Sequence, residues 1–125
     1  MDLLRIDHFA VTVKDLPASA VWYEKVFGFE VIHRFTRTWM VGNERIRIGL
    51  MNRPDAEPVD DLDNKIAFQH AAFLTDSDGL ERAQIALNEL EISFDGPEDT
   101  GIAFSIFVTD PDGHQLEITA YHKTS

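Results

Sequence analysis

Residues 109–121 read TDPDGHQLEITAY and predict a β-hairpin at the end of the fold. The turn lies at residues 110–113 (DPDG), where proline presets φ, the aspartates bond nearby backbone groups and glycine accepts a positive φ. Apolar residues alternate with polar ones on both sides of this turn, so one face of the hairpin is expected to pack on a core. Glu117 lies in mid-strand on the opposite face, where a carboxylate must be solvated, paired or bound to a cation.

Both halves of the chain follow one plan, β-α-β-β-β, and so predict an α+β fold. In the first half, Asp15 and Gly28 are placed to begin and end a helix. In the second half, Asp78 and Glu81 are placed to form a capping box. The predicted strands cover residues 3–13, 29–37, 38–41 and 44–51, then 66–75, 92–94, 103–109 and 115–121, with a loop at 96–101.

Residues 52–65 contain two prolines and show no periodicity, so they are expected to form a linker or mobile loop. We therefore predict a single domain over residues 1–125 that is built from two βαβββ modules, residues 1–52 and 65–122. Their mixed sheets are expected to curl around a shared concavity.

The composition excludes several classes of protein. The 125 residues, 44% of them hydrophobic, suffice for one domain with a core, and the formal net charge of −11 argues against a nucleic-acid partner. The absence of cysteine excludes disulfides, thiolate metal sites and a cysteine nucleophile. No apolar run is long enough to span a membrane, and the N-terminal residues lack a secretion signal. We therefore expect a cytoplasmic protein.

Two histidines occupy matching positions in the repeated plan. His70 follows His8 by 62 residues, and each lies on the first strand of its half, opposite the helix-packed face. If the two sheets curl toward each other, both imidazoles and the Glu117 carboxylate converge. That set binds a divalent metal and leaves positions open for water or substrate. A single strand histidine is more often a core or surface residue, but the matching positions favour metal binding. Of the remaining histidines, His33 is expected on an edge strand, His114 beside the turn and His122 near the terminus.

Four stretches carry a resemblance to a known family. IDHFAVTV (6–13), DLPASAVWYEKVFGF (15–29), FQHAAF (68–73) and DPDGHQLEI (110–118) resemble the vicinal oxygen chelate superfamily. Its members include glyoxalase I, fosfomycin-resistance proteins, extradiol dioxygenases, methylmalonyl-CoA epimerase and bleomycin-resistance proteins. The resemblance implies a glyoxalase-like fold.

The resemblance also implies a metal centre and an assembly. His8, His70 and Glu117 match the superfamily's metal ligands, and Glu117 is also predicted to be catalytic. The implied cofactor is a divalent ion: Fe, Mn, Zn, Ni or Co. In many single-domain relatives the first half of one chain pairs with the second half of its partner, which implies a homodimer with shared sites.

Three positions depart from the patterns of individual members. Glyoxalase I and the epimerase carry a fourth ligand at the position that repeat register gives to Gly49. Fosfomycin thiol transferases and extradiol dioxygenases carry tyrosine at the position of Phe107, although Ser105 matches a serine of the former. The extradiol dioxygenases also place an acid–base histidine before the second ligand, and residues 52–65 contain none. The sequence therefore assigns none of these activities.

Two functions compete. The first is a metal-dependent enzyme, of lyase, isomerase, transferase or dioxygenase type, whose small-molecule substrate chelates the ion through vicinal oxygens. Arg47 is expected to face the same concavity and to bind a substrate carboxylate, although an exposed arginine in solvent is the simpler alternative. The second is a non-catalytic protein of the bleomycin-resistance type that sequesters a drug. Its aromatic lining would be Trp39, Phe35 and Phe107 in an acidic field.

Overall fold

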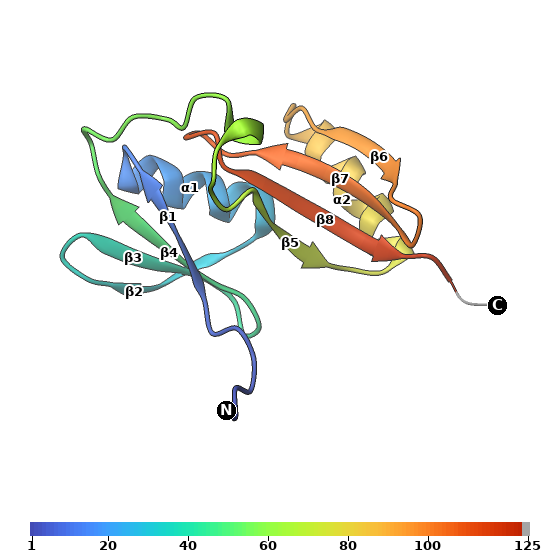
Figure 1. Ribbon diagram of the computed structural model, residues 1–125, viewed down its shortest axis with the longest axis horizontal. Helices are drawn as coiled ribbons and strands as arrows, with labels where there is room; N and C mark the ends of the chain where they lie inside the picture. Colours follow the sequence, from blue (N-terminus) through green and yellow to red (C-terminus); the bar gives the residue numbers. More distant parts are fainter. Residues whose placement is uncertain (124–125) are drawn as a thin grey trace. The chain divides into compact units, whose positions relative to one another are not determined.

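The computed structural model describes residues 1–123 (Figure 1). The chain divides after Pro58, within the predicted linker, into two compact units. Each unit is a four-stranded mixed sheet with a helix against one face, which confirms the α+β, glyoxalase-like fold with two βαβββ modules. Among these residues, no helix combines the length and apolar character that a membrane span requires.

In the first unit the sheet order is β1-β4-β3-β2, with β1 parallel to β4 and the other pairs antiparallel. Helix α1 packs against β2, β3 and β4 and covers the core of this unit. The elements are β1 (Phe9–Val13), α1 (Leu16–Phe27), β2 (Glu30–Arg34), β3 (Thr38–Gly42) and β4 (Arg47–Asn52).

Helix α1 begins and ends where the sequence predicts. The Asp15 side chain accepts a hydrogen bond from the Ala18 backbone N–H at 3.1 Å, and Pro17 lies in the first turn, where its missing donor has no cost. Gly28 ends the helix with a φ of 72°, a left-handed conformation that favours glycine. The fully buried Tyr23 packs the helix onto the sheet.

In the second unit the sheet order is β5-β8-β7-β6, and β5 is parallel to β8. Helix α2 packs against β8 (Figure 1). A short 3-10 helix, η1 (Leu62–Asn64), precedes β5 (His70–Leu74), α2 (Ser77–Glu89), β6 (Asp95–Asp99), β7 (Ala103–Thr109) and β8 (Gln115–Tyr121).

The predicted hairpin is formed by β7 and β8. The buried Asp110 carboxylate accepts hydrogen bonds from the backbone N–H groups of Asp112 at 2.9 Å and His114 at 2.8 Å, and Gly113 has a φ of 93°. Ile106 and Leu116 are buried on the helix-packed face, as the alternation predicts. The turn and the apolar face together fix the register that places Glu117 on the other face.

The first strand of each unit is shorter than predicted. Strand β1 begins at Phe9 and β5 at His70, and the apolar side chains that precede them are exposed. In the parallel pair, Phe9 lies opposite Ile48, so β1 has almost no partner backbone before the start of β4 at Arg47. Alternation alone predicted strand there, but a strand requires a neighbour with which to share hydrogen bonds.

Three further predictions in the second unit are wrong. Residues 92–94 are not a strand, and β6 instead covers residues 95–99, where a loop was expected. Strand β6 is an edge strand with a register shift between Asp95 and Glu98, and such positions tolerate a proline such as Pro97. Helix α2 is capped by Asp76, which accepts from the Gly79 N–H at 2.7 Å, so Asp78 is not the cap. The helix begins at Ser77, one residue before Asp78, so Asp76 takes the capping position.

Candidate functional site

The second unit brings His70 and Glu117 together. Ala72 lies opposite Glu117 in the parallel ladder, and His70 is two residues before Ala72, so both side chains leave the sheet on the face opposite α2. His70 Nε2 lies 3.3 Å from Glu117 Oε1. The side chain of Glu117 is only 15% exposed and that of His70 is 40% exposed, so the pair is sheltered but reachable from solvent.

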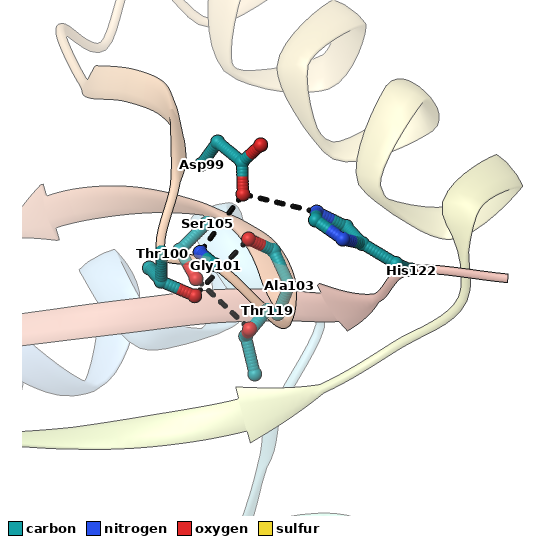
Figure 2. A network of polar contacts seen from close by, with 7 residues as sticks. All are labelled: Asp99, Thr100, Gly101, Ala103, Ser105, Thr119 and His122. Atoms are coloured by element: carbon teal, nitrogen blue, oxygen red, sulfur yellow. Dashed lines mark hydrogen bonds and ion pairs between the residues drawn. The ribbon is translucent and has the colours of Figure 1, made fainter. Parts of the chain in front are cut away.

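A pair of hydroxyl groups fixes the carboxylate of Glu117. The hydroxyl of the fully buried Ser105 on β7 lies 3.3 Å from Glu117 Oε2 and 2.8 Å from Thr119 Oγ1 (Figure 2 shows the contact with Thr119). A hydroxyl carries one proton, so Ser105 can donate to the carboxylate while it accepts from Thr119. The arrangement leaves Oε1 directed at His70. Ser105 was predicted as a site residue; Thr119 was missed, although it shares the face of Glu117.

Phe107 lies beside the same pair. It is the cross-strand neighbour of Glu117, and its ring meets the His70 ring edge to face, with centroids 5.9 Å apart. This contact restricts the orientation of the imidazole and covers one side of it.

The donor atoms of this pair fit a metal ion. Two ligands that each lie about 2.1 Å from one ion are separated by about 3.0 Å at a right angle and about 3.4 Å at the tetrahedral angle. The 3.3 Å between His70 Nε2 and Glu117 Oε1 falls within this interval. Imidazole and carboxylate are also the donors that divalent transition metals accept. Across residues 1–123, however, no group of three or more His, Cys, Asp or Glu side chains is assembled that could hold an ion.

The first unit places His8 next to two charged residues. His8 Nδ1 lies 2.8 Å from Asp7 Oδ2, and Arg47 Nη1 lies 3.8 Å from Asp7 Oδ1. The hydrogen bond with His8 lowers the pKa of Asp7; desolvation opposes this shift, and the positive charges of Arg47 and Arg5 add to it. An ionised carboxylate only accepts, so the proton of this bond is on Nδ1, and Nε2 of a neutral His8 remains available as a ligand. Sequence analysis missed Asp7, although it directly precedes His8.

Gly49 occupies the position in the first unit that Glu117 occupies in the second. It lies opposite Ala10 in the parallel ladder, just as Glu117 lies opposite Ala72, and Ala72 follows Ala10 by 62 residues. Gly49 and Glu117 are therefore equivalent positions of the two units, as the repeated sequence pattern predicts. A Cβ at Gly49 would lie 3.4 Å from the Cβ of Ala10 and 3.7 Å from Cγ2 of Thr38, which are ordinary contacts.

Trp39 lies elsewhere than expected. It is opposite Leu50 in the β3–β4 ladder, which places it on the helix-packed face, whereas Gly49 and Arg47 lie on the other face. The guanidinium of Arg34 stacks over its ring at 4.8 Å. Trp39 therefore does not share a face with Arg47, because the pairing of β3 with β4 sets the side on which it lies.

The other aromatic and histidine positions have neighbours of their own. Phe35 is exposed and its ring lies 6.0 Å from that of His33. His122 Nε2 lies 3.0 Å from Asp99 Oδ1, at the far end of the polar network in Figure 2. His114 follows the hairpin turn, where its backbone N–H bonds to Asp110.

Known proteins with similar sequences include metallothiol transferase FosB of Lysinibacillus sphaericus (strain C3-41). It is 29% identical over 119 residues, which cover 94% of this chain and 82% of FosB. Virulence protein STM3117 from Salmonella typhimurium has a solved structure with 27% identity and a TM-score of 0.73, covering 98% of this chain and 100% of that one.

A fosfomycin resistance protein, FosX from Listeria monocytogenes, superposes with a TM-score of 0.76 at 20% identity, covering 97% of this chain and 94% of FosX. At that identity the likeness shows the fold. A family model described as the Glyoxalase/Bleomycin resistance protein/Dioxygenase superfamily matches residues 5–118. The match spans most of the sequence and includes His8, His70 and Glu117. The chain therefore belongs to the Glyoxalase/Bleomycin resistance protein/Dioxygenase superfamily.

Proposed function

We propose that this protein is a divalent-metal-dependent enzyme of the superfamily, with His8, His70 and Glu117 as the metal ligands. The observation that carries the proposal is the 3.3 Å separation of His70 Nε2 and Glu117 Oε1 on one face of a sheet. When bound, the ion would supply Lewis-acid chemistry to a small substrate that chelates through two vicinal oxygens. The name of the similar FosB, metallothiol transferase, supports a metal cofactor.

The surrounding residues have distinct tasks in this proposal. Two neutral imidazoles and one carboxylate leave a divalent site with a net charge of about +1, which suits an anionic oxygen of the substrate. Ser105 holds the second oxygen of Glu117, and Phe107 orients His70 and keeps water from one side of its ring. Arg47, exposed on the Gly49 face of its sheet, is positioned to pair with a substrate carboxylate.

We further propose that the protein is a homodimer in which His8 of one chain joins His70 and Glu117 of the other. Four apolar side chains before the edge strands support a second copy as the partner. Leu4 and Ile6 precede β1, and Ile66 and Phe68 occupy the matching positions before β5, 62 residues later. Their relative exposures are 96% for Leu4, 84% for Ile6, 109% for Ile66 and 101% for Phe68. Exposed apolar residues that extend an edge strand favour pairing with another chain.

Metal content tests the enzyme proposal. Protein purified, stripped and reconstituted with Fe, Mn, Zn, Ni or Co is expected to retain about one ion per chain after exhaustive dialysis. Elemental analysis gives the stoichiometry for each metal. A protein that retains none of the five ions contradicts the proposal and favours the drug-sequestering alternative, which needs no metal.

Gly49→Glu tests the vacant position opposite Ala10. The new carboxylate is expected to act as a fourth ligand and to tighten metal binding by about tenfold, and a Cβ at this position makes only ordinary contacts. Competition with a chelator of known affinity measures the change. Gly49→Leu is the control, since it adds a side chain of similar bulk without an oxygen. Equal metal affinities for Gly49→Glu and Gly49→Leu would show that Gly49 does not border the site.

A further inference from the structure

An open pocket lies at one end of the first unit. Its volume is about 470 Å³, within the range typical of small-molecule sites. The Asn52 N–H donates to the Arg37 carbonyl at 2.7 Å, and the Arg53 N–H donates to the Val13 carbonyl at 2.8 Å, so backbone bonds at the ends of three strands hold the two arginines. The pocket is lined by Arg37, Asn52, Arg53, Pro54, Asp55 and Ala56.

Within the first unit, the pocket lies away from Gly49. Thr38 lies opposite Met51, and Arg37 and Asn52 continue the same ladder by one residue. Because side chains alternate along a strand, Arg37 and Asn52 lie on the face of the sheet opposite to that of Thr38 and Met51. Gly49 lies on the face of Met51, and Asn52 is three residues, or about 10 Å, further along the strand. A ligand in the pocket would therefore not share the coordination sphere of an ion beside Gly49.

The charge of the pocket is opposite to that of the chain. The protein has 22 acidic and 11 basic residues, yet within residues 1–123 neither Arg37 nor Arg53 forms an ion pair. Arg53 Nη1 donates to the Asn52 carbonyl at 3.1 Å, which uses one of its five N–H groups. Two arginines and a single acidic residue, Asp55, line the pocket, so its lining carries a net positive charge.

We propose that this pocket binds the oxyanion group of a small molecule, a phosphate or a carboxylate, through Arg37 and Arg53. Each guanidinium presents paired N–H groups that match two oxygens of such an anion. Pro54 and Ala56 supply an apolar wall for the carbon skeleton. The chain as a whole carries a net charge of −11, so a pocket lined by two arginines is a locally favourable place for an anion.

Isothermal titration of the metal-free full chain tests the proposal, with pyrophosphate and citrate as separate probes at constant ionic strength. We expect saturable binding of at least one probe, and the stronger one identifies the group as phosphate or carboxylate. Arg37→Gln and Arg53→Gln are each expected to weaken binding by about tenfold or more, because each removes a charge-assisted contact.

Arg45→Gln is the matched control, since Arg45 is an exposed arginine of the same unit outside the pocket. It removes the same charge and is expected to leave the affinity unchanged. Circular dichroism checks that each variant is folded. Lack of saturable binding of both probes overturns the proposal, as does an equal loss in Arg45→Gln. The titration contains no metal and measures no turnover, so its failure leaves the proposed enzyme function standing.

Discussion

Metal affinity is expected to fall by about 100-fold or more when Glu117 is replaced by alanine, and the protein is expected to stay folded. The loss follows because Glu117 would supply the only anionic ligand. The fold survives because Glu117 lies on the face opposite α2, outside the apolar core. His8→Ala and His70→Ala are expected to behave in the same way. Elemental analysis after dialysis measures occupancy, and circular dichroism measures folding.

Matched control variants distinguish the loss of a metal ligand from a general effect of substitution on metal occupancy. Glu98→Ala removes an exposed carboxylate from β6 of the same sheet, and His114→Ala removes a histidine beside the hairpin turn. Both are expected to keep wild-type occupancy. Ser105→Ala is expected to weaken binding by about tenfold, since it frees one oxygen of Glu117 but keeps the ligand. Full occupancy in any of the three ligand variants would remove that residue from the site.

Mixing two defective variants is expected to restore metal sites that neither contains alone. If His8 of one chain joins His70 and Glu117 of the other, a dimer of one His8→Ala chain and one Glu117→Ala chain has one intact site. Its second site carries both lesions. After dissociation and random reassociation in equal amounts, half of the dimers are mixed, so occupancy should return to about a quarter of the wild-type level.

The control for this experiment is each variant taken alone through the same dissociation and reassociation. Neither is expected to regain metal. If each site is built within one chain, every site in the mixture keeps one lesion, and occupancy stays at the level of the separate variants. That result, or sedimentation of the wild-type protein as a strict monomer, would refute the shared-site proposal while the ligand assignments remain open to the single-variant test.

The sequence determined the local features of this protein. Asp15 and Gly28 define a helix because capping depends on residues within one turn of its ends. Residues 110–113 define the hairpin turn, and the period of two along β8 places Glu117 away from the helix. The same alternation assigned His70 to the face that it occupies. These features require only neighbours in the chain, so pattern and stereochemistry suffice to predict them.

Features that depend on pairing between distant segments were harder to predict from the sequence. Alternation extended the first strand of each unit beyond its partner, and it placed the strand before β7 at residues 92–94 instead of 95–99. The side of the sheet on which Trp39 lies follows from its pairing with Leu50, which only the folded sheet defines. An edge strand that contains proline gives a weak sequence signal, since the same residues are typical of loops.

The candidate site shows the same division. Residue types and repeat positions alone indicated His8, His70 and Glu117. Tertiary structure decided the 3.3 Å between His70 Nε2 and Glu117 Oε1, the support from Ser105 and Thr119, and the pairing of Asp7 with His8. These contacts fix donor distance, carboxylate orientation and the free nitrogen of His8, and all of them depend on where side chains meet in space. Sequence spacing sets which face a residue occupies, whereas the distance between two donors is set by the strands that hold them.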